Sequence, residues 1–286
     1  MVLSGLQDQL APLKSWLFPR RVYLQLEDHA FKAMVLDGDH VAWLEQVSLP
    51  EGLCVNGQPM AVEALGDLLG DLLVERGFPG ARVKAVLPRA ATTWRVIEWP
   101  QSKWPDEPEL LVRQQQLDLA LPWSLQQADL FLEPLGAAPP RSLLVAVQRD
   151  VLESWIEVFN QAGVVLDGLE ALSICLWRAV KSQLGTGVQV LLQLGSPNSR
   201  LLALDQDQPL GDWALPSMDD PKQLEEALQR WCERYEPSGG IVTATEAETQ
   251  AMLPELEHLM RCPLIWSPHG RDELPLWGLV QAEIKG

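Results

Sequence analysis

The chain has 286 residues, enough for one large domain or two moderate ones, and its 47% hydrophobic content is that of an ordinary globular protein. A formal net charge of −17 argues against non-specific nucleic-acid binding and against docking on an anionic membrane, since both need a basic face. No apolar run is long enough to span a membrane, and no signal peptide opens the sequence. Four scattered cysteines and four unpaired histidines indicate reduced thiols, no metal site and a cytoplasmic location.

The chain opens with a predicted amphipathic helix over residues 1–20, in which leucines recur at steps of three and four residues. We expect this helix to pack on the body of the protein or to contact a partner or a lipid surface. A first lobe, residues 21–104, follows it. Its predicted elements are three strands, a helix and a fourth strand, at about 22–26, 31–36, 41–47, 62–73 and 82–87, and a further strand at 94–99.

The same order of elements returns about 165 residues later, in a second lobe predicted over residues 169–286. The pattern indicates an internal duplication of topology rather than of sequence, and therefore an α/β protein of two related lobes. The elements of this second copy are predicted at 188–194, 200–204, 209–214, 224–235 and 241–244.

Residues 105–168, between the two copies, are predicted to form a small inserted α+β subdomain. A helix from about residue 169 to 183 would then bridge the lobes. The predicted elements of the insertion are a helix at 109–119, strands at 129–132 and 142–147, a helix at 152–159 and a strand at 164–166.

A duplicated plan of this kind with a bridging helix is the architecture of actin-like nucleotide-binding proteins. Short segments spread over most of the chain resemble, in order and spacing, the PilM family of type IV pilus assembly proteins. They resemble more loosely the cytoplasmic part of the type II secretion protein GspL. The matching segments are 31–36, 85–88, 95–100, 121–122, 143–147, 162–163 and 169–172.

The resemblance implies an ATP site between the lobes, where glycine-rich turns press backbone N–H groups against the phosphates and carboxylates organise magnesium. In the first turn, Tyr23 replaces the first glycine of the family pattern, Gln25 the acidic residue and Glu27 the loop glycine. Glu27 and Asp28 would direct two negative charges at a phosphate. Only Lys32 still matches a phosphate-binding role.

The second turn departs from the family pattern in a similar way. Gly195 is kept, with Ser196 after it, but Gln193 replaces the acidic residue and Pro197 removes an N–H donor. We therefore expect at most a vestigial nucleotide site, at Lys32, Gly195 and Ser196.

In place of a third glycine element, Thr245 and Glu248 form a helix capping box, and Gly239-Gly240 precede the last strand instead of following it. The sequence also lacks the motifs of other common catalytic sites. The prediction is therefore a pseudo-ATPase that uses no cofactor, with ATP and magnesium as the alternative.

The resemblance also implies that the protein binds the cytoplasmic tail of a PilN-like membrane protein, in a groove between the first lobe and the inserted subdomain. In this sequence, residues 85–99 and 143–159 would form that groove. The candidate contacts are the arginines and tryptophans of these segments: Arg89, Trp94, Arg95, Arg149 and Trp155. Trp155 equally fits the apolar face of its helix, as a core residue.

Three hypotheses follow. The first is a non-catalytic PilM-like adaptor, peripheral to the cytoplasmic face of the inner membrane and serving pilus assembly, twitching motility or competence. Its partners would be a PilN-like protein, the pilus motor ATPase or a second copy of the chain. It would not bind nucleic acid. The second is a functional actin-like ATPase with degenerate motifs, and the third is a GspL-like secretion adaptor.

Overall fold

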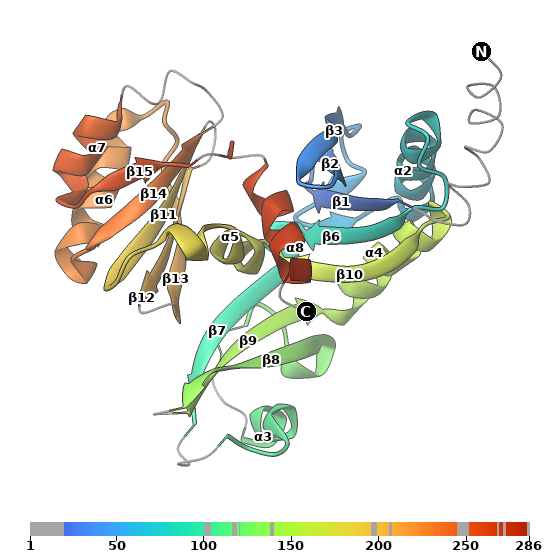
Figure 1. The fold of residues 1–286 in the computed structure, drawn as a ribbon. Helices are drawn as coiled ribbons and strands as arrows, with labels where there is room; N and C mark the ends of the chain where they lie inside the picture. The colour runs from blue at the N-terminus through green and yellow to red at the C-terminus, as the bar shows by residue number, and fades with distance from the viewer. Residues whose placement is uncertain are drawn as a thin grey trace. The chain divides into compact units, whose positions relative to one another are not determined.

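The computed structural model describes residues 20–99, 104–115, 119, 121–137, 140–195, 199–205, 208–244, 252–267, 269–270 and 273–284 (Figure 1). The chain divides into two compact units, Met1–Leu172 and Ser173–Gly286. The helix predicted over residues 1–20 lies, except for its last residue, outside the described residues.

The first unit is built on a five-stranded sheet in the order β10-β6-β1-β2-β3. β1 is antiparallel to β2, and β2 to β3, whereas β6 runs parallel to both β1 and β10. The strands are β1 (Arg21–Leu26), β2 (Ala30–Asp37), β3 (His40–Ser48), β6 (Arg82–Leu87) and β10 (Val165–Ala171), and a short hairpin is formed by β4 (Cys54–Val55) and β5 (Gln58–Pro59).

Two helices of the first unit, α2 (Val62–Glu75) and α4 (Arg149–Gln161), pack on one face of this sheet. Leu65 and Leu69 of α2 and Trp155 and Phe159 of α4 are essentially fully buried in the same apolar core as the sheet residue Leu24. α2 has the spacing of an amphipathic helix, so its apolar stripe meets the sheet while its polar side faces water.

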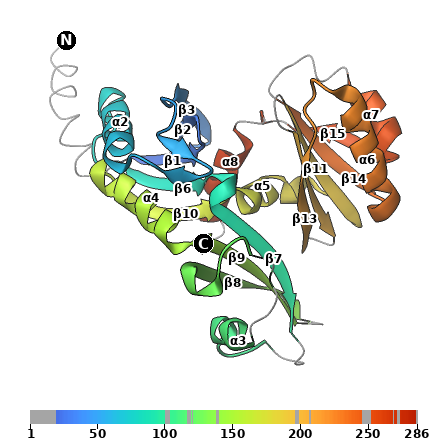
Figure 2. The same cartoon turned by 180° about the vertical axis from the view of Figure 1, so that it is seen from behind.

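The second unit repeats this plan, with a sheet in the order β13-β12-β11-β14-β15. Helices α6 (Pro221–Tyr235) and α7 (Leu253–Met260) pack on one face of it, as Figure 2 shows. Its other elements are β11 (Val188–Leu194), β12 (Ser199–Asp205), β13 (Gln208–Leu215), β14 (Gly239–Ala244), β15 (Leu264–Trp266), α5 (Leu172–Val180) and α8 (Leu274–Ile284).

The predicted duplication is confirmed, because each sheet combines an antiparallel three-strand meander with two parallel strands on the other side of its first strand. In chain order, α2 corresponds to α6 and α4 corresponds to α7. One detail differs from the prediction. Gly239 and Gly240 lie inside β14, where Gly240 packs so closely against β11 that an added Cβ would lie 2.6 Å from the carbonyl oxygen of Val190.

The insertion is a three-stranded antiparallel sheet, β7-β9-β8, with helix α3 (Pro108–Gln115). Its core is separate from the first core and includes Val112, Leu130 and Leu144. The indole N–H of Trp99 donates a hydrogen bond to the buried hydroxyl of Ser142. The strands are β7 (Thr92–Glu98), β8 (Ala128–Ala137) and β9 (Pro140–Gln148).

The structure places the boundaries of the insertion differently from the predicted 105–168. β7 belongs to the insertion, since it pairs with β9, whereas α4 and β10 belong to the first lobe. Because β10 continues to Ala171 as a strand parallel to β6, the helix predicted from residue 169 begins at Leu172. The insertion therefore spans the segment from β7 to β9.

Candidate functional site

A groove of about 280 Å³ lies within the first unit, where the three-stranded sheet of the insertion meets α4 and the edge strand β10. Its lining is almost entirely apolar. The lining residues are Leu87, Thr92, Phe131, Val145, Val147, Leu152, Ile156, Leu166, Asp167, Gly168, Leu169 and Ala171.

Strand register and helix periodicity explain why these side chains meet. Thr92 pairs with Val147 and Phe131 with Val145, so the three strands of the insertion present one apolar face to the groove. Leu152 and Ile156 lie one turn apart on α4. Phe131 and Ile156 are 57% and 39% exposed, and large apolar side chains exposed together mark a binding surface.

β10 contributes backbone as well as side chains to this groove. It is an edge strand of the five-stranded sheet, so one side of its backbone is not paired with another strand of that sheet. Its pairing with β6 shifts register between Leu166 and Gly168, which marks a bulge at Asp167. An extended peptide beside β10 could therefore pair with its backbone while placing apolar side chains in the groove.

Asp167 is the single ionisable residue among the described residues that line the groove, and its negative charge is paired with two arginines. Its carboxylate accepts hydrogen bonds from Arg82 at 2.7 Å and from Arg21 at 3.2 Å. The bond from Arg82 is the main reason why the pKa of Asp167 lies below its usual range. The groove therefore suits an apolar ligand rather than a strongly charged one.

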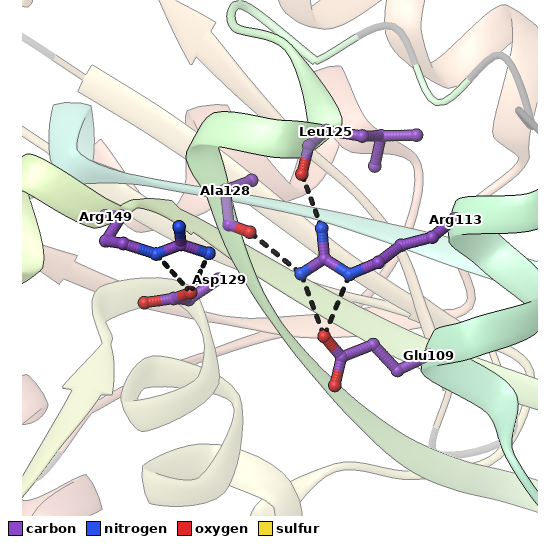
Figure 3. A network of polar contacts seen from close by, with 6 residues as sticks. All are labelled: Glu109, Arg113, Leu125, Ala128, Asp129 and Arg149. Carbon is purple, nitrogen blue, oxygen red and sulfur yellow. Dashed lines mark hydrogen bonds and ion pairs between the residues drawn. The ribbon is translucent and has the colours of Figure 1, made fainter.

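Arginines fix the elements beside the groove, as Figure 3 shows. Arg149, at the start of α4, donates to the Asp129 carboxylate of β8 at 3.0 and 3.1 Å. Arg113 of α3 donates to the carbonyl oxygens of Leu125 and Ala128 at 2.6 and 3.0 Å, and its charge is paired with Glu109. These contacts tie α3 and α4 to the beginning of β8, the strand that carries Phe131.

Residues of both predicted groove segments line the groove, but two of the predicted contact residues do not face it. Trp155 is fully buried and donates from its indole N–H to the Gly57 carbonyl oxygen at 2.9 Å, so it is a core residue and the prediction of a surface contact is wrong. Arg95 donates to the carbonyl oxygen of Leu119, within the insertion and on the face of β7 opposite Thr92.

The other predicted contacts are more accessible. Arg149 has a side chain that is 45% exposed, and Arg89 is exposed in a short 3-10 turn before β7. Trp94 is half-buried and shares the Thr92 face of β7. Phe131, Leu152 and Ile156 were not among the predicted contact residues. The predicted contacts were arginines and tryptophans, whereas the groove is lined mainly by aliphatic residues and phenylalanine.

The turn between β1 and β2, predicted as half of a vestigial nucleotide site, contains an internal ion pair. The ammonium group of Lys32 lies 2.9 Å from Oε1 of Glu27, and the same oxygen accepts from the Gln25 amide at 2.6 Å. The side chain of Lys32 is only 8% exposed. The Glu27 carboxylate thus occupies the position at which Lys32 would meet a phosphate, and the turn fits a polyphosphate poorly.

The neighbouring carboxylate, Asp28, anchors the β4–β5 hairpin. Its Oδ1 accepts from the backbone N–H of Gly57 at 2.7 Å and from the Cys54 thiol at 3.4 Å. Gly57 has a φ of +79°, and an added Cβ would lie 2.6 Å from the backbone nitrogen of Ala91, so only glycine fits there. Since Gly57 also accepts from Trp155, a continuous chain of hydrogen bonds joins this turn to α4.

The corresponding turn of the second unit is described only in part. The backbone N–H of Gly195 donates to the Ser199 hydroxyl at 3.2 Å, whereas Ser196 and Pro197 lie outside the described residues, as do Thr245 and Glu248. Just after the turn, the buried guanidinium of Arg200 forms an ion pair with Asp212 and donates to the Ser173 hydroxyl at 2.7 Å.

Within the described part of the chain, no three histidine, cysteine or acidic side chains gather as metal ligands would. Among the same residues, no helix combines the length and apolar character needed to cross a bilayer.

The sequence matches no protein-family model and no curated protein. Similar solved structures do exist. A PilM–PilN type IV pilus biogenesis complex matches with a TM-score of 0.76 and 16% identity, over 93% of this chain and 99% of that chain. The cytoplasmic domain of EpsL, an inner-membrane component of the type II secretion system of Vibrio cholerae, matches with a TM-score of 0.56 and 12% identity, over 93% and 95%.

A Bacteroides thetaiotaomicron protein with an actin-like ATPase fold and unknown function also matches, with a TM-score of 0.54 and 12% identity, over 91% of this chain and 95% of that chain. At these identities the likeness concerns the fold. The chain has an actin-like α/β fold, as predicted, and its similarity to the PilM–PilN structure extends over almost the whole chain.

Proposed function

We propose that this chain is a non-catalytic actin-like adaptor of a type IV pilus or related inner-membrane assembly, and that it binds the cytoplasmic tail of a PilN-like membrane partner. The observation that carries the proposal is the apolar groove beside β10, with Phe131 and Ile156 exposed in it. The likeness to a PilM–PilN complex supports the choice of partner. This role would keep the protein at the cytoplasmic face of the membrane through its partner.

The experiment is a titration of this chain with the fluorescently labelled N-terminal tail of a PilN-like protein from the same organism. Complete burial of an Ile or Phe side chain is worth about 1.5–3 kcal/mol, and only about half of each of these side chains is still exposed, so Ile156→Lys and Phe131→Lys should each weaken binding about three- to tenfold. Val74→Lys is the matched control, since Val74 is an apolar residue of α2, 61% exposed, that neither lines the groove nor belongs to β10. Equal losses in all three variants would reject the groove as the site.

The Glu27–Lys32 ion pair supports the non-catalytic part of the proposal. We expect labelled ATP with magnesium to show no saturable binding at micromolar concentrations. Saturable binding would favour an actin-like ATPase instead.

A secretion adaptor is the second candidate, supported by the weaker likeness to EpsL. Binding of a type II secretion partner, with no binding of the pilus tail, would favour it.

A further inference from the structure

The second unit contains a larger groove that the proposed function does not use. It lies between α6 and α7 and has a volume of about 1330 Å³. This volume exceeds the roughly 300–1,000 Å³ of typical small-molecule sites, so it suits a segment of polypeptide. The groove follows the 15 residues of α6, a length of about 22 Å at 1.5 Å per residue.

The duplicated plan shows what is unusual about this groove. In the first unit, the corresponding helices α2 and α4 pack closely through Gly66 and Gly70. An added Cβ at Gly66 would lie 2.5 Å from the Cβ of Gln161, and one at Gly70 would lie 3.0 Å from the carbonyl oxygen of Ala162. α6 contains no glycine, and its side chains leave a groove against α7 where the first unit has a closed contact.

The basic residues of α6 lie away from the groove, whereas most of its glutamates line it. Glu225 and Glu233 of α6, and Glu236 just after it, line the groove, whereas Glu226, Lys222, Arg230 and Arg234 do not. α7 and its end add two glutamates, and Arg261 is the only lysine or arginine in the lining. Five glutamates against one arginine give the lining a net charge of −4 with histidine neutral.

The floor of the groove is apolar. Leu224, Leu228 and Leu256 are buried beneath it, and the partly buried Met252 and Leu259 lie along it. An apolar floor with an acidic rim complements a helix that has one apolar face and basic residues beside it. The same negative charge disfavours an anionic ligand or an anionic lipid surface.

We propose that the α6–α7 groove is a second docking site, which binds a basic amphipathic α-helix of a partner protein. The site would be independent of the peptide groove beside β10. A helix of about 14 residues spans the length of α6. Its apolar side chains would cover the leucine floor while its lysines or arginines face Glu225 and Glu233.

The test uses the full chain and a labelled leucine–lysine peptide of about 14 residues with helical periodicity, followed by fluorescence anisotropy at physiological salt. A peptide of the same composition, scrambled to remove that periodicity, measures non-specific attraction to the acidic protein. Gln229→Trp, which places a bulky ring in the groove, should weaken binding at least tenfold. Gln223→Trp, on the same helix but outside the lining, should leave it unchanged.

A second pair of variants tests the charge. Glu233→Gln should weaken binding about two- to fourfold, as expected for one exposed ion pair, and Glu226→Gln, outside the lining, should not. Equal binding of the scrambled peptide, or equal effects of the lining and control variants, would overturn the proposal. Self-association that Gln229→Trp abolishes, without peptide binding, would also overturn it, because the occupant would then be a second copy.

Discussion

The ion pair between Glu27 and Lys32 allows a quantitative prediction about the turn that resembles a nucleotide-binding element. Lys32 is the more buried partner, with a side chain 8% exposed against 22% for Glu27. Glu27→Gln therefore removes the carboxylate that lies 2.9 Å from a largely buried ammonium group. Loss of one partner from a fully buried ion pair lowers the free energy of unfolding by about 3–5 kcal/mol. Because Glu27 is partly exposed, we expect a smaller decrease of about 2–3 kcal/mol.

The reverse substitution should cost less. Lys32→Met leaves a carboxylate that still accepts from Gln25 and reaches water, so we expect a loss of about 1 kcal/mol. In the double variant both members of the ion pair are replaced, and the double-mutant cycle should give a coupling free energy of about 1–2 kcal/mol. The asymmetry between the two single variants follows directly from their difference in burial.

Thermal unfolding followed by tryptophan fluorescence measures these effects, because the chain contains 12 tryptophans. A loss of 2–3 kcal/mol in a unit of this size should lower Tm by about 4–12 °C. An unchanged Tm for Glu27→Gln would refute the reasoning, since it would mean that the buried ammonium group does not depend on Glu27. A larger loss for Lys32→Met than for Glu27→Gln would refute the burial argument.

Three further predictions concern other buried or paired groups. Arg200→Met removes the Arg200 partner of the Asp212 carboxylate, which is 10% exposed and still accepts from the Ser173 hydroxyl, and should cost about 3 kcal/mol in urea unfolding, while adding Asp212→Asn should recover part of the loss. Burial raises the pKa of the Cys54 thiol to about 12 and that of Cys262 to about 11, so both should resist iodoacetamide at pH 8 in the folded protein, and rapid labelling of Cys54 would contradict this. Arg82 lowers the pKa of Asp167 from its usual value of 3.8. The ionised Asp167 therefore stabilises the folded protein at neutral pH, and this contribution is lost as the pH falls below about 4. Asp167→Asn should therefore make Tm depend less on pH below about pH 4.

Strand patterns in the sequence predict the two sheets well, because alternation and turn residues are local signals. The predicted bounds of β6 and β11 agree with the structure, and the order of elements in both units was sufficient to indicate the actin-like plan. The borders of the insertion were wrong for a physical reason. A strand pattern does not say which sheet the strand joins, and the apolar face of α4 could have packed on either core.

The candidate groove was predicted at the level of segments but not of residues. Thr92, Val145 and Ile156 lie in the predicted segments 85–99 and 143–159 and line the groove. Phe131 lies outside both segments, and no local pattern distinguishes its exposed side chain from a buried strand residue. Trp155 was predicted as a contact for its residue type, although helix periodicity fitted a core residue equally well, and the structure places it in the core.

The hydrogen bonds from Asp28 through Gly57 to Trp155 also bear on how this protein can change over evolutionary time. Replacing Asp28 with glycine would remove one negative charge from the turn, but it would also remove the acceptor that holds the β4–β5 hairpin beneath α4. The same helix carries Leu152 and Ile156, so loss of this acceptor would loosen one wall of the groove beside β10. Asp28 is therefore constrained by more than the turn itself, because losing its carboxylate would also disturb the hydrogen bonds that position α4 beside the groove.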